Sequence, residues 1–151
     1  MNLNVPYEKQ QLDYTCGPRS LSMVLSYFNQ TIPLETLIAL AGTTEQLGTS
    51  RQGMIRAFRV LNMFPKFKCN GTIEDLRESL AAQSPPIVNH RDEHEDFGHF
   101  SVVVKITKTH ITLHDPLHGQ DLRYPHAEFV RRWYGRHKTQ FTRWYLTAHP
   151  R

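Results

Sequence analysis

The adjacent prolines Pro85 and Pro86 divide the 151-residue sequence into two parts with different hydrophobic periodicity. Before them, apolar residues recur every three or four positions, which is the spacing of helices with one buried face. After them, short β-branched or alternating runs are separated by turn residues, as in antiparallel strands. A parallel sheet would need alternating strands and helices instead. The sequence therefore predicts an α+β fold, with a helical N-terminal half packed on an antiparallel sheet from the C-terminal half.

Local signals set the bounds of the expected elements. Pro33 opens a helix that Gly42 closes, and Ser50 or Thr49 can cap the next one. Thr72 begins another helix, with Asp75 where a capping box would carry a longer acid or amide. A short strand-like run covers residues 66–69. The expected helices are 16–28, 34–41, 52–61, one from 72 through 80, and 126–133, and the expected strands are 87–89, 100–106, 111–114, 121–124 and 141–147.

Composition and charge restrict the class of protein. Hydrophobic residues make up 39% and charged residues 21%, which is globular, and the length suits one domain covering residues 1–151. No apolar run approaches the roughly 20 residues of a membrane span, and no signal peptide opens the chain. We therefore expect a cytoplasmic protein without a membrane span. Its two cysteines, Cys16 and Cys69, are expected to be free thiols, with Cys69 buried or half-buried.

The net charge of +4 arises largely in the last third of the chain. A solvated basic face is the simpler interpretation, because mild basicity alone is a weak signal for nucleic acid. An acidic or phosphate-bearing partner remains the alternative, and we expect no nucleic acid. Aromatic residues in the same third, Trp133, Tyr134, Trp144 and Tyr145, are expected to pack in the core or on the sheet. The basic residues concerned are Arg131, Arg132, Arg136, His137, Lys138 and Arg143.

Cys16 stands where polar turn residues give way to a helical pattern. The positive end of a helix dipole and the unpaired amides of the first turn favour a thiolate over a thiol. A thiolate can attack a carbonyl if a base and donors for the oxyanion lie nearby. Cys16 is therefore a candidate nucleophile, although a lone cysteine at a helix start is more often structural.

The remaining parts of a catalytic site have candidates elsewhere in the chain. His99 and Asp115 are sixteen positions apart, which suits adjacent antiparallel strands joined by a turn near Lys108 and Thr109. His99 would act as the base and Asp115 would orient it, while the Gln10 amide and the Cys16 backbone N–H would stabilise the oxyanion. Taken singly, each residue could instead belong to a turn. Their combination indicates cysteine acyl transfer.

The nine histidines raise the question of a metal site. Three fall at positions 90, 94 and 99 and three at 110, 114 and 118, but neither run has a zinc-binding spacing, and no HExxH or paired CxxC pattern occurs. His90 to His94 lies in an acidic segment, residues 91–96, that is typical of a solvated loop. This loop could lie over the site and select a basic substrate segment. We expect no metal and no organic cofactor.

Three blocks of the sequence resemble the papain-like cysteine peptidases that process bacteriocin leader peptides at a double-glycine site. The blocks are Gln10 followed by Cys16-Gly17-Pro18 and residues 20–25, then residues 98–103, and then Asp115-Pro116. The resemblance implies a papain-like fold, a peptide or protein substrate, and roles for Gln10 (oxyanion hole), Cys16 (nucleophile), His99 (base) and Asp115 (orienting group).

Members that mature bacteriocins are usually fused to a membrane exporter. The sequence shows neither membrane spans nor a Walker loop, so we expect a stand-alone domain. The favoured interpretation is a cysteine peptidase that cleaves a peptide bond after a Gly-Gly type leader. Two alternatives stay open: a cysteine acyltransferase such as a transpeptidase or a phytochelatin-synthase-like enzyme, and a non-catalytic peptide-binding module. Oligomeric state does not follow from the sequence.

Overall fold

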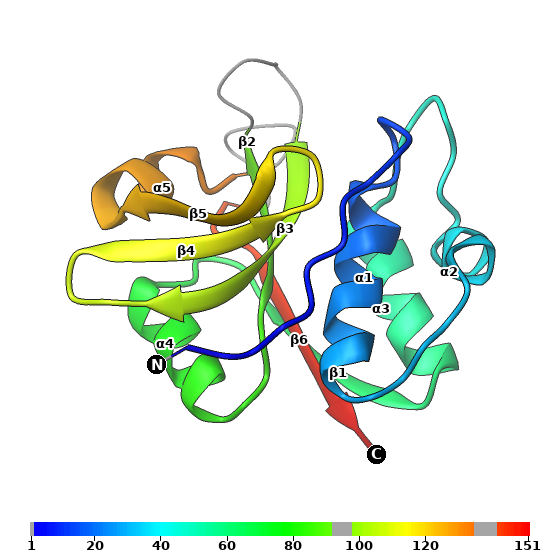
Figure 1. Ribbon diagram of the computed structural model, residues 1–151, viewed down its shortest axis with the longest axis horizontal. Coiled ribbons are helices and arrows are strands. Elements are labelled where there is room, and N and C mark those ends of the chain that lie inside the picture. Colours follow the sequence, from blue (N-terminus) through cyan, green and yellow to red (C-terminus); the bar gives the residue numbers. More distant parts are fainter. Residues whose placement is uncertain (1, 92–97, 135–141) are drawn as a thin grey trace.

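The computed structural model describes residues 2–91, 98–134 and 142–151 (Figure 1). Helices in the first part of the chain are followed mainly by strands, and the chain ends in a strand that returns beside the first one. In chain order, the elements are α1 (Cys16–Tyr27), α2 (Leu34–Ala41), α3 (Arg51–Val60), β1 (Met63–Lys68), α4 (Ile73–Ala81), β2 (Ile87–Arg91), β3 (Gly98–Ile106), β4 (His110–Asp115), β5 (Gly119–Pro125), α5 (His126–Arg132) and β6 (Tyr145–Pro150).

The six strands form one antiparallel sheet in the order β1-β6-β2-β3-β4-β5. Helices α1, α2 and α3 gather on one side of the molecule, and α4 and α5 lie on the other, with the strands between them (Figure 1). This is the α+β arrangement predicted from the two periodicities, with β1 as the strand that interrupts the helical half. It brings α1 against the middle of the sheet.

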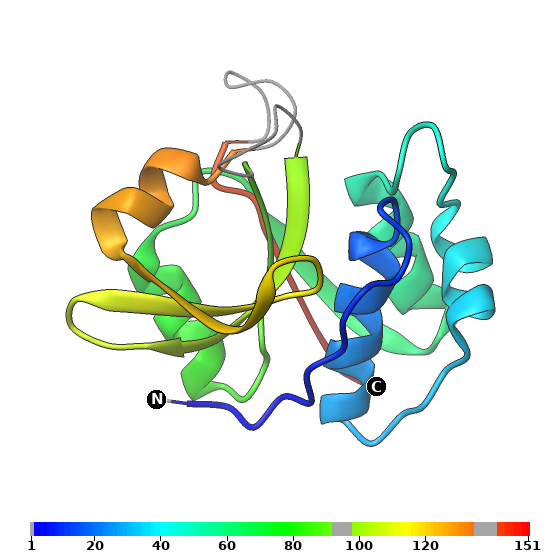
Figure 2. The same ribbon diagram turned by 45° about the horizontal axis from the view of Figure 1, so that its top comes forward.

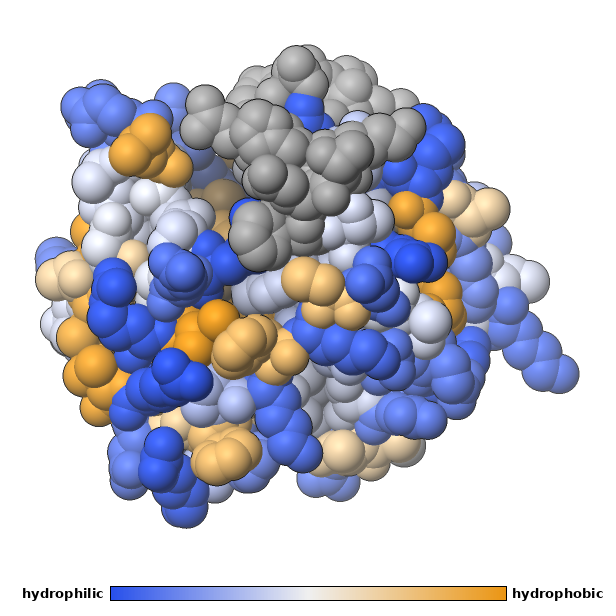
Figure 3. All heavy atoms as spheres, turned by 180° about the vertical axis from the view of Figure 1, so that it is seen from behind, coloured by the Kyte–Doolittle hydropathy of each residue, from blue (hydrophilic) through white to orange (hydrophobic). Residues whose placement is uncertain are grey.

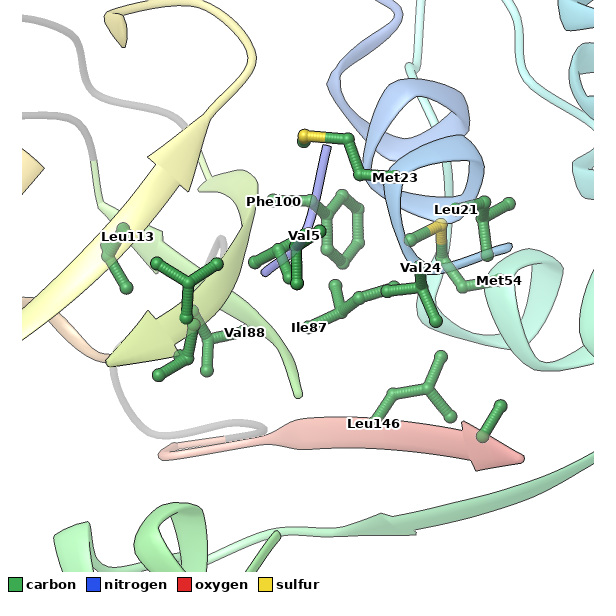
Figure 4. Close-up of a cluster of buried hydrophobic side chains, with 14 of the residues drawn as sticks. Val5, Leu21, Met23, Val24, Met54, Ile87, Val88, Phe100, Leu113 and Leu146 are labelled. Atoms are coloured by element: carbon green, nitrogen blue, oxygen red, sulfur yellow. The ribbon is translucent and has the colours of Figure 1, made fainter. Parts of the chain in front are cut away.

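The core lies where α1 meets β2, β3 and β6. Val24 of α1 packs toward Ile87 and Leu146, and Leu21 lies on the side of Met54 (Figure 4). These side chains and Phe100 are all buried in one core. Each fully buried aliphatic or aromatic side chain stabilises a fold by about 1.5–3 kcal/mol. Because α1 is held by this packing, its first residue has a fixed position relative to the sheet.

The extended N-terminal segment runs between α1 and the sheet (Figure 1 and Figure 2). The amide of Leu3 donates to the carbonyl of Val104 at 2.8 Å, and Asn2 forms an isolated bridge with Lys105. Val5 is buried within the same core. The segment therefore approaches the helix start as a restrained part of the fold.

The local signals read from the sequence act as expected. Ser50 caps α3 by accepting from the amide of Gly53, and Gly42 ends α2 at φ 66°, the left-handed region that glycine adopts at low cost. Thr72 and Asp75 form a complete capping box, so the shorter Asp75 side chain still reaches the backbone N–H of Thr72, as a glutamate would. The predicted bounds of α2 match the observed ones, and those of α3 and α4 differ from them by one residue at each end.

Gly53 also lets α2 and α3 approach closely. A β-carbon at this position would lie 2.1 Å from the carbonyl oxygen of Ala41 at the end of α2. No side chain can be accommodated there without separating the two helices, because protein interiors are densely packed.

Three sequence predictions need correction. Cys69, expected to be buried or half-buried, is exposed just beyond β1, an edge strand. The last strand begins at Tyr145 and ends at Pro150, later than predicted. His90 and Arg91, expected at the start of a loop, are buried in β2 because they pair with His99 and Gly98. The rest of the predicted acidic loop lies outside the described residues.

The surface of the described residues is mixed in character. Figure 3 shows, from behind, hydrophobic residues in separate patches among hydrophilic ones. The aromatic residues Trp133 and Trp144 are buried, as predicted. Of the helices in the described ranges, none is long and apolar enough to cross a membrane.

Candidate active site

Cys16 is the first residue of α1, as the sequence predicts, and its side chain is half-buried. Thr15 precedes it and makes no side-chain capping hydrogen bond to the helix. Pro18 falls within the first turn, where the missing N–H costs no helical hydrogen bond. The first turn thus places a thiol beside backbone amides that no capping side chain occupies.

Gly17 lets a neighbouring loop reach this first turn. A β-carbon on Gly17 would lie 2.6 Å from the hydroxyl oxygen of Thr49, whose Oγ1 hydrogen-bonds with that of Thr43 at 2.6 Å. The loop before α3 therefore packs directly beside Cys16. The sequence suggested a cap at this loop but gave no sign of this contact.

His99 and Asp115 are brought together by the hairpin of β3 and β4. Both side chains are buried, and Nε2 of His99 lies 2.5 Å from Oδ1 of Asp115. The strands are joined by residues 107–109, the turn that the sequence predicted. The sixteen-residue separation therefore places an imidazole and a carboxylate in direct hydrogen-bond contact.

The electrostatics of this pair favour an imidazolium and a carboxylate. Burial opposes a charge on His99, but its hydrogen bonds with Asp115 and Cys16 outweigh that effect and raise its pKa from 6.5 to about 10. Burial likewise opposes the Asp115 charge, but the His99 hydrogen bond, the charges of His99 and His90, and the amide of His118 lower its pKa to about 2. The same ring also hydrogen-bonds with the Cys16 side chain, so a cysteine and an imidazole are in direct contact, as nucleophilic catalysis by cysteine requires.

The Asp115 carboxylate is held by its own turn. Oδ1 also accepts from the amides of Leu117 at 2.9 Å and His118 at 3.0 Å, while Oδ2 is buried with no hydrogen-bond partner among the described residues. The turn interpretation of Asp115-Pro116 and the catalytic one are therefore both compatible with the structure. The turn orients the carboxylate toward the ring.

Gln10 is buried beside the turn that leads into α1. Its amide nitrogen donates to the carbonyl of Leu12 at 2.9 Å, and the same carbonyl accepts from Thr15 through both the hydroxyl at 2.9 Å and the backbone N–H at 3.3 Å. One amide hydrogen of Gln10 is left after this bond. Its side chain is thus tied to the turn that ends at Cys16.

The N-terminal segment also connects α1 to the end of β4. The backbone N–H of Gln10 donates to the carbonyl of Pro116 at 2.7 Å, and the hydroxyl of Tyr7 donates to the backbone carbonyl of Asp115 at 2.8 Å. On the helix side, the Glu8 carboxylate accepts from Arg19 at 3.0 Å and from Ser22 at 2.8 Å. Sequence reasoning missed Tyr7 and Glu8, because nothing in their local pattern marks contacts made over such separations.

A second buried histidine stands next to the pair. His90 of β2 faces His99 across the strands, with ring centroids 5.4 Å apart, and its Nε2 lies 2.8 Å from the hydroxyl of Ser101. Sequence reasoning assigned His90 to a loop. Extending the predicted strand 87–89 by one residue would have indicated its place.

Of the other histidines that raised the metal question, His118 lies against His99, with ring centroids 5.9 Å apart, whereas His114 and His110 have other partners. His114 binds the carbonyl of Val5 through Nε2, at 2.9 Å, and His110 contacts Thr109. His94 lies outside the described residues. Neither sequence run forms a metal-binding group within the described ranges. The group of potential ligands that does form combines His90 and His99 with Asp115.

The basic residues near the C-terminus are partly paired. Arg131 and Arg132 both form ion pairs with Glu128, at 2.7 Å and 2.5 Å. Residues 136–138 lie outside the described ranges. Pairing within α5 is consistent with a solvated basic face, the simpler of the two interpretations.

Comparison with known proteins identifies relatives of this arrangement. The model of the Peptidase C39 family matches residues 4–137. The chain is 28% identical over 127 residues to the lactococcin-G-processing and transport ATP-binding protein LagD of Lactococcus lactis, and 30% identical over 112 residues to an uncharacterised protein of Methanothermobacter marburgensis. These matches cover 83% and 74% of the chain. The chain spans 17% of the length of LagD and 72% of the length of the archaeal protein.

Solved structures show the same fold. A double glycine motif protease from an AMS/PCAT transporter, crystallised with its leader peptide, has a TM-score of 0.76 and 26% identity, with 99% of this chain and 94% of that one covered. The peptidase domain of Streptococcus ComA has a TM-score of 0.79 and 19% identity, with 98% of this chain and all of that one covered. The papain-like α+β architecture expected from the sequence is confirmed.

Proposed function

Because this chain belongs to the peptidase C39 family and is thereby a cysteine peptidase, we propose that it cleaves leader peptides after a double-glycine motif by means of Cys16, His99, Asp115 and Gln10. The observation that carries the assignment of the residues is the hydrogen-bonded series from the start of α1 through His99 to Asp115. The chemistry of the substrate is taken from the double glycine motif protease that shares this fold.

In the first half-reaction, the Cys16 thiolate attacks the carbonyl carbon of the scissile bond. The negative charge moves to the carbonyl oxygen, where the backbone N–H of Cys16 and the remaining amide hydrogen of Gln10 stabilise it. His99 then gives its proton to the leaving amine, and a thioester with Cys16 remains. Since Nε2 of His99 is bound to Asp115, Nδ1 is the ring nitrogen available for these transfers.

In the second half-reaction, neutral His99 takes a proton from water, and the resulting hydroxide attacks the thioester. The collapse of the second tetrahedral intermediate releases the acid product and restores the thiolate and imidazolium. Asp115 holds the ring in one orientation throughout and stabilises its charged form, the role of the third residue in a catalytic triad. The turn amides bind this carboxylate, and the Tyr7 hydroxyl binds the backbone carbonyl of the same residue.

A peptide that carries a Gly-Gly sequence before the cleavage point tests the proposal directly. We expect Cys16→Ala to abolish hydrolysis and to leave the midpoint of thermal unfolding unchanged, because the side chain is small and half-buried. Cys69→Ala is the matched control, since Cys69 is exposed outside the site and its loss should not alter the rate. Persistent hydrolysis by Cys16→Ala would exclude Cys16 as the nucleophile.

Product analysis separates the proposed hydrolysis from acyl transfer. Mass spectrometry of the reaction, with and without a small amine, should give the free acid in both cases. A predominant amide adduct would indicate a transferase that uses the same residues. A substrate with both glycines replaced by valine tests the specificity, and equal cleavage of the two substrates would contradict the double-glycine assignment.

A further inference from the structure

His90, His99 and Asp115 form a cluster of metal-ligating groups near the ends of the neighbouring strands β2, β3 and β4. All three side chains are buried, and one potential ligand atom from each lies within 4.8 Å of the other two. They come from three adjacent strands, so the register of the sheet sets their spacing. Two of them belong to the proposed catalytic machinery, whereas the mechanism above does not use His90.

The donor set is suited to a divalent transition metal. Two imidazole nitrogens and one carboxylate oxygen bind Zn²⁺ at about 2.0–2.2 Å, which separates tetrahedral ligands by about 3.4 Å. The outermost spacing is at most 4.8 Å, so a contraction of at most about 1.4 Å brings the three groups to that geometry. Side-chain rotation can supply an adjustment of this size.

A second observation is independent of this spacing. Oδ2 of Asp115 is fully buried and has no hydrogen-bond partner among the described residues, whereas Oδ1 accepts three bonds. An unpaired buried carboxylate oxygen is costly, because a partner or a cation must replace its lost hydration. A cation next to Asp115 would satisfy this atom without removing the turn amides from Oδ1.

We propose that His90, His99 and Asp115 bind Zn²⁺ or a similar divalent transition metal, and that the bound metal switches the peptidase off. The inhibitory part of this proposal rests on the function proposed above, because it requires His99 to be the catalytic acid and base. The binding part does not, since it depends only on the three side chains.

The inhibition follows from the protons of His99. The ring nitrogen that faces Asp115 is Nε2, and metal binding there displaces its proton to solvent. The remaining proton stays on Nδ1, next to Cys16. A neutral imidazole with the metal on Nε2 and hydrogen on Nδ1 has no lone pair to accept a proton from water. It is also too weak an acid to protonate a leaving amine. Both half-reactions are therefore blocked, and no electron transfer is involved.

A metal bound instead by the Cys16 thiolate and His99 would inhibit as well. Thiolate is the softer ligand and is a good one for zinc. The two arrangements differ in their requirements: the proposed cluster needs His90 and not Cys16, whereas the thiolate site needs Cys16 and not His90. Variants at these two positions therefore distinguish them.

The first experiment measures metal binding by the inactive Cys16→Ala protein, so that its result is independent of peptidase activity. We expect Zn²⁺ to bind with a stoichiometry of one in calorimetry, and Co²⁺ to give visible bands without the near-ultraviolet band of a cobalt thiolate. Loss of binding in Cys16→Ala would overturn the proposal, and so would a thiolate band in the parent protein at one equivalent of Co²⁺.

The second experiment replaces His90. In the Cys16→Ala background, His90→Gln should weaken Zn²⁺ binding about a hundredfold, at least the effect of losing a supporting residue of a metal site. Gln can still bond to Ser101, and His90→Asn is the second variant if the first unfolds below the assay temperature. His149→Gln is the matched control, because His149 is exposed at the end of β6. Unchanged affinity in a folded His90 variant would overturn the proposal.

Inhibition is then compared in proteins that retain Cys16. Each variant is referred to its own rate in the presence of a chelator, so that any change in basal turnover cancels. We expect the Zn²⁺ concentration for half inhibition to rise about a hundredfold in His90→Gln and to stay the same in His149→Gln. Tight binding to Cys16→Ala without inhibition of the active enzyme would overturn the switch. A protein that hydrolyses no peptide under any condition would instead refute the proposed function.

Discussion

The two sides of the candidate site are built by different means. His99 and Asp115 stand on neighbouring strands of a six-stranded sheet, and backbone pairing along the hairpin fixes their separation. Gln10 lies in an irregular segment, where individual hydrogen bonds to Leu12 and Pro116 hold it. Cys16 belongs to a helix, but the turn that precedes it connects it to the same segment.

The two sides differ in how many contacts hold each site residue in its position. A sheet distributes the position of one residue over many backbone hydrogen bonds, so a single substitution changes the chemistry of the His99 side chain more than its place. The segment 3–10 depends on a few side-chain contacts, including those of Glu8 and Tyr7. We therefore expect different effects of substitution on the two sides. On the sheet side a substitution should change the charge at His99, and in the N-terminal segment it should displace Gln10.

Asp115→Asn should have the largest effect. The neutral amide cannot stabilise imidazolium, and its NH₂ group can favour the wrong tautomer of His99, so kcat/KM should fall by about 10³- to 10⁴-fold. The turn amides of Leu117 and His118 can still bond to the amide oxygen. The measurement is steady-state cleavage of the Gly-Gly peptide, with circular dichroism to verify the fold. A loss of less than tenfold would mean that His99 needs no orienting charge.

Gln10→Ala should follow, with a decrease in kcat of about 10²- to 10³-fold, the usual effect of removing one oxyanion donor. KM should change little, because the amide acts on charge that develops after the substrate binds. Gln11→Ala is the matched control, since Gln11 is adjacent and exposed. Equal effects of the two substitutions would show that the segment is sensitive to any change and that Gln10 has no specific role.

Glu8→Gln should have a smaller effect that appears only on the N-terminal side. The carboxylate joins the segment to Arg19 and Ser22 of α1, and a displaced segment would misplace Gln10. We expect kcat to fall by about tenfold through loss of positioning. Alkylation of Cys16 by iodoacetamide at about pH 6 should stay faster than that of Cys69, because the contact with His99 is intact. Slowed alkylation would show that the two sides are not independent.

The parts of the fold that could be predicted from sequence are those with local causes. Periodicity gives α1, and capping residues give α3 and α4, because each signal lies within a few positions of the structure that it specifies. The hairpin of β3 and β4 follows from two alternating runs and a turn. The place of β1 at an edge beside β6 does not, since that pairing joins residues in the middle of the chain to residues at its C-terminal end.

The same distinction applies within the site. His99 and Asp115 belong to one hairpin, and the sequence gives their separation directly. Sequence reasoning assigns His90 to a loop because a polar residue at the end of a short strand resembles the start of a loop. Only the pairing of β2 with β3 makes it a buried neighbour of His99. Tyr7 and Glu8 act through contacts that no local pattern encodes.

The pH dependence of stability should provide the smallest and most specific test of the sheet side. The pKa of His99 is raised from 6.5 to about 10, so folded protein retains a proton that unfolded chain releases between these values, and the free energy of unfolding should fall as pH rises through that window. The pKa of Asp115 is lowered from 3.8 to about 2, so stability should also fall as pH decreases from about 4 toward 2. Stability from the pair is then greatest between about pH 4 and 6.5. Chemical denaturation of the native protein and Asp115→Asn should give a difference in unfolding free energy that is largest between about pH 4 and 6.5 and shrinks toward about pH 2 and about pH 10. A constant difference would mean that the hydrogen bond between Nε2 and Oδ1 does not carry the charge on which the sheet side depends.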